Sequence, residues 1–351
     1  MINFLKIILI PVIPAYAFVV AIRNWLFERK IFREKRVEAL IISVGNLTVG
    51  GSGKTPLVIY LLDLLKNYGL KAGVLSRGYG RKSRGYKFVS DGEEIFTSVD
   101  ECGDEIYQTV SECHIPGAVC ENRVKGAEKF IKETGVNILV LDDAFQHRWI
   151  YRDLNVLVCE QKFLLSRNFL IRNLLPTGNL REPFTSVKRA DVVIINRKFS
   201  EGKDIPEDLQ KYFKGKKIFT ANYKAIGLVD IKRKVDHNIE EFKGQKSLLV
   251  SGVADPSSLI NILEQNDINT ENRMIFIDHK NYSNKEIQSI RKNFYNTNSH
   301  SVITTQKDAV KLVGFSKEFD DIDIFYLKIK MEMSDELSFN KFILDKLNLN
   351  Q

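Results

Sequence analysis

The sequence is poor in the residues that build metal centres and disulfide frameworks. It has 4 cysteines in 351 residues, and none of them forms a Cys-x-x-Cys pair. This spacing indicates neither a zinc site nor a disulfide framework, so free thiols in the cytosol are the simplest interpretation. We find no internal repeat and no low-complexity tract, which excludes repeat architectures. The cysteines are Cys102, Cys113, Cys120 and Cys159.

A guanine-reading motif is also absent. The stretch Asn196-Arg197-Lys198-Phe199 lacks the acid of the N-K-x-D pattern, which argues against a GTPase. The formal net charge of +8 suggests an anionic partner, such as nucleic acid, a nucleotide or a membrane surface. A chain of this length is expected to hold about two domains.

The chain is organised around a glycine-rich stretch at residues 45–56. Residues 39–44 before it predict a strand, and residues 56–66 after it have helical character. Glycines let backbone N–H groups approach phosphate oxygens, and the new helix presents its positive end there. We predict that Lys54 reaches the β- and γ-phosphates and that Thr55 ligates Mg²⁺. The candidate nucleotide-binding residues are Thr48, Gly50, Gly51, Ser52, Gly53, Lys54 and Thr55.

Thr48 departs from the G-x-x-x-x-G-K-[ST] pattern, which has glycine at that position. The alternative for the whole stretch is a glycine-rich turn beneath a buried helix. The Gly-Lys-Thr sequence between a strand and a helix favours a phosphate-binding loop.

A second signal is the apolar run at residues 137–141, which ends in Asp142 and Asp143. A buried strand ending in acid is how phosphate-loop proteins place the carboxylate that holds Mg²⁺. Adjacent side chains on a strand point to opposite faces, so the two aspartates are expected to have separate roles. For the nearby His147 we predict a hydrogen-bonded structural role.

Three further sets of polar residues lie at the ends of predicted elements or in a predicted loop. Arg77 follows the predicted strand 71–76, where it would face phosphates or an anionic substrate, or belong to a surface turn. Asp104 stands at a helix start, where it either caps the helix or accepts a proton from an attacking hydroxyl. Arg181 and Glu182 lie in a loop at residues 174–183, and such loops often carry function.

The strand pattern predicts a P-loop-type α/β fold with a mostly parallel sheet and helices on both faces. A polar stretch near residues 200–217 separates it from a smaller α/β unit, whose polar clusters also follow strands and would face the first unit across a cleft. The first-unit strands are 39–44, 71–76, 137–141, 154–159 and 191–196; the second-unit strands are 246–253, 273–277 and 301–305. The expected divisions are a membrane-anchoring segment (1–36), a P-loop kinase domain (37–217), a connecting ribbon (218–236) and a smaller α/β domain (237–351).

The N-terminus predicts membrane association. Residues 7–22 contain no charge, yet the run is short for a full span and two prolines would kink it, which favours a monotopic or single-helix anchor. Its alternative is a signal peptide, because Ala15-Tyr16-Ala17 mimics a cleavage site. Basic and aromatic residues at 23–36 predict a helix on an anionic leaflet, or else a solvated helix packed on the domain.

Taken in order, these motifs make the chain similar to the tetraacyldisaccharide 4′-kinase family of lipid A biosynthesis. Thr48 fits this family, which carries threonine there, whereas Ala144 and Gln306 stand where glycine and glutamate are expected. The matching segments are 45–56, Ser76 to Gly80, Gly103 to Glu105, Asp142-Asp143, Gln146-His147, Leu174 to Pro183, Ser251 to Pro256, Asp278-His279 and Thr304 to Asp308.

The resemblance implies ATP- and Mg²⁺-dependent phosphorylation of the 4′-hydroxyl of a tetraacylated glucosamine disaccharide 1-phosphate, giving the bisphosphorylated lipid A precursor lipid IVA. It places this reaction at the cytoplasmic face of the inner membrane. We also expect a monomer that binds no nucleic acid. By position Asp104 matches the catalytic aspartate and His279 its partner, and closure of the two domains would assemble this pair over bound substrates.

The remaining site residues follow from the same resemblance. Lys54 would hold the transferring phosphate, Thr55 and one of Asp142 or Asp143 would hold Mg²⁺, and Arg181 with Glu182 would bind the sugar or its 1-phosphate. Two alternative functions are a membrane-tethered nucleotide switch or metallochaperone, and a nucleic-acid-binding ATPase.

Overall fold

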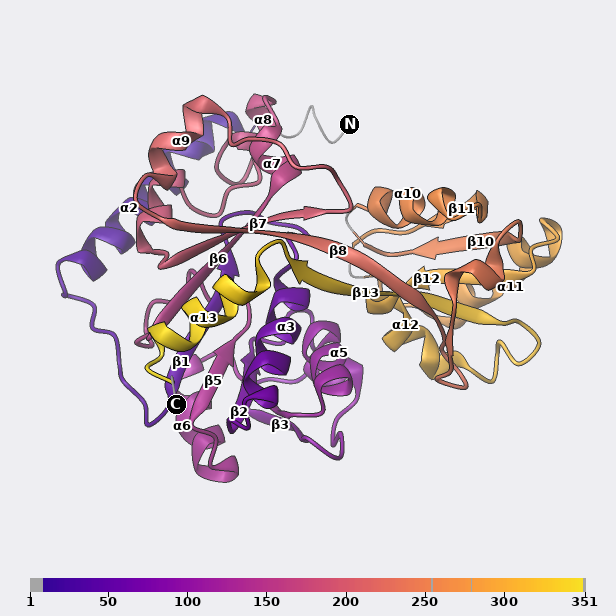
Figure 1. Cartoon of the computed structure of the whole chain (residues 1–351), viewed down its shortest axis with the longest axis horizontal. Helices are drawn as coiled ribbons and strands as arrows, with labels where there is room; N and C mark the ends of the chain where they lie inside the picture. Colours follow the sequence, from indigo (N-terminus) through magenta and orange to yellow (C-terminus); the bar gives the residue numbers. More distant parts are fainter. Residues whose placement is uncertain (1–8, 254, 279, 350–351) are drawn as a thin grey trace.

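A computed structural model describes residues 9–253, 255–278 and 280–349. The described strands form one mixed sheet in the order β11-β10-β12-β13-β8-β7-β6-β1-β5-β2-β4-β3, with β9 paired to β8 (Figure 1). The strands are β1 Leu40–Asn46, β2 Ala72–Ser76, β3 Lys87–Asp91, β4 Pro116–Val119, β5 Ile138–Leu141, β6 Leu154–Glu160, β7 Val192–Lys198, β8 Lys217–Asp230, β9 Asp236–His237, β10 Lys246–Ser251, β11 Asn269–Ile275, β12 Ser301–Thr305 and β13 Ile324–Met333.

Helices cover this sheet and fill the connections between its strands (Figure 1). The α-helices are α2 Ile13–Glu28, α3 Lys54–Asn67, α4 Val99–Cys102, α5 Asp104–Cys113, α6 Arg123–Thr134, α7 Gln161–Leu165, α8 Phe169–Arg172, α9 Glu207–Phe213, α10 Ser257–Gln265, α11 Asn284–Asn296, α12 Gln306–Leu312 and α13 Glu336–Lys346. The 3₁₀ turns are η1 Ile10–Val12, η2 Phe184–Arg189, η3 Ile239–Phe242 and η4 Val313–Phe315.

The predicted fold class is confirmed. All five strands expected in the first unit exist, as β1, β2, β5, β6 and β7, and they pair in parallel with one another. The second unit contains the three expected strands, β10, β11 and β12, also in parallel. We call residues 37–217 the N-terminal half and residues 218–349 the C-terminal half.

Two long strands join the halves, and one of them was not predicted. The expected ribbon is β8, which pairs in parallel with β7 and antiparallel with β13. Because β13 also pairs with β12, the sheet continues without a break from one half into the other. Figure 1 shows β8 and β13 running from the body of the molecule into the C-terminal lobe. The edge pair β3 and β4 was also missed.

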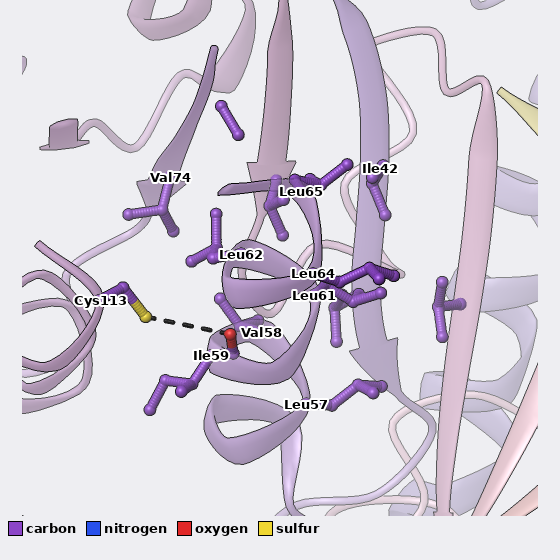
Figure 2. Close-up of a cluster of buried hydrophobic side chains, with 14 of the residues drawn as sticks. Ile42, Leu57, Val58, Ile59, Leu61, Leu62, Leu64, Leu65, Val74 and Cys113 are labelled. Atoms are coloured by element: carbon purple, nitrogen blue, oxygen red, sulfur yellow. Dashed lines mark hydrogen bonds between the residues drawn. The ribbon is translucent and has the colours of Figure 1, made fainter. Parts of the chain in front are cut away.

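Helix α3, which follows the glycine-rich loop, is anchored by its apolar side chains. Leu57, Leu61 and Leu65 recur every four residues, which places them on one face of the helix, and all three are fully buried. They belong to a cluster with Ile42 of β1 and Val74 of β2 (Figure 2). This packing fixes the start of α3 against the end of β1, where the loop lies.

The N-terminal helix α2 is apolar but largely exposed. Residues Ile10–Glu28 are long and apolar enough to cross a membrane by length and composition, with mean hydropathy 1.5 and 11% of the segment buried. The exposed fractions of Phe18 and Val19 are 65% and 64%. On its other face, Phe27 is buried against Trp149, and Arg23 pairs with Glu182.

Two details of this region differ from the sequence prediction. The prolines do not kink the helix: Pro11 lies in the 3₁₀ turn η1 and Pro14 in the first turn of α2, where proline is tolerated because those N–H groups lack helical partners. The predicted basic helix also ends at Glu28, and residues 29–36 continue as turns and extended chain.

Candidate active site

The glycine-rich loop connects β1 to α3, and its backbone conformation requires glycine at the start of the helix. Gly53 caps α3 with φ +96°, a conformation that L side chains rarely adopt. A Cβ there would also lie 2.0 Å from the Asn196 amide nitrogen and 2.4 Å from the Tyr223 hydroxyl. Only glycine fits this position, so the loop backbone and the start of α3 are fixed together.

Two buried asparagines that the sequence analysis did not assign to the site brace the loop. The Asn46 amide donates to Ser52 Oγ at 2.8 Å and to Thr48 Oγ1 at 3.2 Å. From β7, the Asn196 amide donates to the Ser52 carbonyl at 3.0 Å and to the Tyr223 hydroxyl at 2.9 Å. A satisfied buried network of this kind specifies one loop conformation. The signal for both residues was an asparagine at the end of a buried strand.

Lys54 lies beside the acids that end β5. Its Nζ is 3.7 Å from Asp143 Oδ1 and 3.4 Å from Asn46 Oδ1. Asp143 also accepts two hydrogen bonds from Arg181 Nη1, at 2.8 and 2.9 Å. Burial alone would raise the pKa of Asp143, but the charges of Lys54 and Arg181 hold it below its usual value. The structure therefore brings together Lys54, Asp143 and Arg181 from three segments.

Asp142 has a different environment from its neighbour. Its side chain is buried, and Oδ1 has no hydrogen-bond partner in the described part of the chain. Burial, together with the charges of Glu105 and Asp143, raises the pKa of Asp142 to about 7. A buried carboxylate oxygen without a partner, near the loop that carries Thr55, fits the oxygen donors that Mg²⁺ prefers.

Arg123 is a further buried residue at this edge that the sequence analysis missed. It begins α6 directly after the β4 connection, and its Nη2 donates to the Asp142 carbonyl at 3.4 Å. Burial lowers its pKa to about 10 despite the attraction of both aspartates. The available signal was a polar run, residues 121–123, shortly after a buried strand.

His147 lies in the same half, partly buried. Its Nε2 has no hydrogen-bond partner within the described residues. Burial, followed by the charges of Arg123, Arg152 and Arg77, lowers its pKa to about 4. The ring is therefore neutral at physiological pH, and the hydrogen bond predicted for it is not formed through Nε2.

Asp104 is the first residue of α5 and is 3% exposed. Its Oδ2 is 2.9 Å from Lys311 Nζ and 3.9 Å from Lys307 Nζ, both on α12 of the C-terminal half. Gly103, which precedes Asp104, packs against the backbone of Gly78 and Tyr79 after β2. Because β2 pairs in parallel with β5, the start of α5 lies at the same edge of the sheet as the β5 acids. Its predicted partner His279 lies outside the described residues.

The remaining predicted substrate residues are placed differently from one another. Arg181 is partly exposed beside Asp143, and Arg77 is exposed after β2. Glu182, by contrast, is fully buried, and its two carboxylate oxygens pair with Arg23 of α2 and Arg189. The structure thus separates Arg181, which faces the acids, from Glu182, which joins α2 to the domain.

These features define a P-loop nucleotide-binding enzyme: a strand, a glycine-rich loop bearing lysine, a helix, and acids at the end of a neighbouring parallel strand. The family model described as tetraacyldisaccharide-1-P 4′-kinase matches residues 5–348. The chain belongs to this family.

Individual members of the family are similar to this chain over almost its whole length. The tetraacyldisaccharide 4′-kinase of Flavobacterium psychrophilum is 34% identical over 355 residues, covering 98% of this chain and 97% of the relative. That of Aquifex aeolicus is 33% identical over 331 residues, covering 94% and 96%. A crystal structure of LpxK from Aquifex aeolicus in complex with ATP superposes with a TM-score of 0.78 at 31% identity, covering 97% of this chain and 99% of that one.

Proposed function

We propose that this protein is a tetraacyldisaccharide 4′-kinase, which transfers the γ-phosphoryl group of ATP to the 4′-hydroxyl of a tetraacyldisaccharide 1-phosphate. The observation that carries this proposal is the pairing of two features at one edge of the sheet. The loop with Lys54 and the β5 acids supplies a nucleotide site, and Asp104 supplies a buried carboxylate at the same edge. Family membership supports the same reaction.

The phosphate-binding residues act by position and charge. Lys54 would neutralise charge that develops on the transferred phosphoryl group, and the loop N–H groups would hold the phosphates against the start of α3. We assign the metal to Thr55 and Asp142, because Asp143 is already engaged by Arg181 and Lys54. Mg²⁺ bound there would supply charge neutralisation for the phosphate oxygens.

Asp104 is our candidate for the proton acceptor, with His279 as its partner. The 4′-oxygen would attack the γ-phosphorus while its proton passes to this pair, and the electron pair of the broken P–O bond would leave on ADP. For the substrate we propose Arg77 and Arg181 as contacts to the anionic sugar phosphate. Glu182, buried between two arginines, would act on substrate only through Arg181 and α2.

We propose that the enzyme acts as a monomer at the cytoplasmic face of the inner membrane. The exposed apolar face of α2 supports the membrane association in this proposal. Phe18, Val19 and Trp25 would insert into the leaflet that contains the acylated substrate. Phe18→Asp should reduce flotation with vesicles containing anionic lipid. As the matched control, Leu337→Asp changes an exposed apolar side chain on α13 and should float like the wild type.

The reaction is tested by following label from γ-labelled ATP into tetraacyldisaccharide 1-phosphate in detergent micelles. We expect transfer by the wild type and heavy loss in Asp104→Ala and His279→Ala. The controls are Asp100→Ala and His114→Ala, both exposed and close in sequence to α5, and both should remain active. No transfer by the wild type, with ATP binding confirmed, would favour a nucleotide switch instead.

A further inference from the structure

The two halves meet through complementary polar side chains on α5 and α12. Figure 1 shows α12 beside α5. The start of α12 meets the end of α5, and the end of α12 meets the start of α5, so the two helices are antiparallel along this contact. Gln306 Nε2 donates to Glu112 Oε2 at 2.7 Å, at the far end of α5. At the near end, Lys307 Nζ lies 3.5 Å from Glu105 Oε1. In each of these pairs an acceptor on α5 faces a donor on α12.

Lys311 makes the most buried of these contacts. Its side chain is 10% exposed, and its Nζ is 2.9 Å from Asp104 Oδ2. The same Nζ donates to the backbone carbonyl of Lys280 at 3.3 Å. Lys280 follows β11 and pairs with Glu286 at 2.7 Å, so this carbonyl belongs to a tethered segment. One ammonium group thus joins the start of α5, α12 and the segment after β11.

We propose that Lys311 is a positioning residue for the reaction: it holds the Asp104 carboxylate in place and ties the Lys280 backbone carbonyl to the same ammonium group. This inference rests on the proposed role of Asp104 as proton acceptor. A carboxylate as buried as Asp104 needs an opposite charge, and Lys311 provides one at hydrogen-bonding distance. Because the cation comes from the other half, Asp104 is fully oriented only when α12 is packed on α5.

Asp308, also on α12, differs from Lys311 because its hydrogen-bond partners lie in its own half. Asp308 is fully buried and accepts hydrogen bonds from Gly252 N at 2.9 Å, the Tyr282 hydroxyl at 3.0 Å and Thr305 Oγ1 at 2.7 Å. All of these partners belong to the C-terminal half. Asp308 therefore stabilises its own half, whereas Lys311 reaches across to a residue of the proposed active site.

The kinetic test compares Lys311→Met with Lys311→Arg and with Lys317→Met, a matched loss of one exposed lysine in the same half. Misplacement of a reacting group by about 1 Å costs roughly 100-fold in rate, so we expect kcat of Lys311→Met to fall by about that factor. KM for ATP should stay within about threefold, because Lys54 and the loop are untouched. Lys311→Arg keeps the charge and should recover at least about tenfold, and Lys317→Met should match the wild type.

A double variant separates positioning from general stabilisation. If Lys311 acts through Asp104, then Lys311→Met in an Asp104→Ala background should lower turnover no further, because residues that act as a unit are not additive. An equal loss in both backgrounds would overturn the proposal. So would wild-type kcat in Lys311→Met.

Amide hydrogen exchange reports on the α5–α12 contact and needs no lipid substrate. Exchange across residues 104–113 and 306–312 should be faster in Lys311→Met than in Lys317→Met, because the link between the helices is lost. Unchanged exchange would overturn the proposal even if the wild type were inactive on the disaccharide. Absence of wild-type transfer, with faster exchange in Lys311→Met, would instead contradict the proposed function.

Discussion

The acids of β5 and the acid of α5 lie at the same edge of the sheet but are held in different ways. Asp143 takes its cations, Lys54 and Arg181, from the N-terminal half. Asp104 takes Lys307 and Lys311 from the C-terminal half. The charged groups around Asp143 therefore come from one half alone, whereas orienting the proposed proton acceptor requires both halves.

This difference separates two properties that experiments can measure independently. Changes around Lys54 should alter both nucleotide binding and turnover, since the loop and the β5 acids form one network. Changes at the α5–α12 contact should alter turnover while ATP binding is kept. The following predictions run from the largest expected effect to the smallest.

Replacing Lys54 with methionine should have the largest effect. The charge that faces the transferring phosphate would be lost, and turnover should fall on the order of a thousand-fold. Lys66→Met is the matched control, because Lys66 is on the same helix and bonds the Cys113 carbonyl instead. Steady-state kinetics with the lipid acceptor would measure both, and similar turnover in the two variants would contradict the assigned site.

Gly53→Ala should break the nucleotide site through the backbone. A side chain at φ +96° costs about 1–3 kcal/mol, and its Cβ would collide with Asn196 and Tyr223. We expect ATP affinity, measured by calorimetry, to fall roughly 100-fold as the loop shifts. Gly314→Ala is the control, because no atom of the described residues lies within 4 Å of the Cβ it would add. Wild-type affinity in Gly53→Ala would show that the loop geometry is not required.

His147 should make the N-terminal half sensitive to acid. Its folded pKa of about 4 lies below the usual value, so between pH 6.5 and 4 the unfolded chain binds more protons than the folded one. The free energy of unfolding should therefore fall with decreasing pH in this window, by at most about 1.4 kcal/mol per pH unit from this group. Urea unfolding of His147→Gln should have a shallower dependence, and an identical slope would exclude the residue as the cause.

Lys307→Met should have the smallest effect. Lys307 is partly exposed and 3.9 Å from Asp104, so its contribution is expected to be about 1 kcal/mol or less. Turnover should fall no more than about fivefold, and the difference from wild type should shrink in high salt because screening weakens exposed pairs. A loss as large as that of Lys311→Met would show that the two lysines are equivalent.

Local pattern was enough to predict the nucleotide half of the fold. The apolar run 39–44, the glycine loop and the helix after it correspond to β1, the loop and α3, because each signal lies within a few residues. β13 was missed although residues 327–333 alternate apolar and charged side chains, a period of two that predicts a half-buried strand. The pairing of β13 with β8 joins the halves. A local sequence pattern cannot predict which strand another strand pairs with.

The sequence predicted which residues belong to the site better than it predicted the residues that they pair with. Glu182 suggested a substrate contact, yet its cation Arg23 is 159 positions away in sequence, so its burial between two arginines had no local signal. The pairing of Asp104 with Lys311 likewise depends on how α12 packs on α5. Asn196 was considered only against the guanine-reading motif, and its bond to the loop carbonyl depends on tertiary structure.

The most direct measurement compares ATP dissociation constants and turnover in Asp104→Asn and Lys54→Met. Asp104→Asn should bind ATP within about threefold of the wild type, by calorimetry, while its transfer to tetraacyldisaccharide 1-phosphate is lost. Lys54→Met should lose both affinity and transfer. Equal weakening of ATP binding by the two variants would contradict the division between a nucleotide site whose charged groups come from one half and a proton acceptor held by the other.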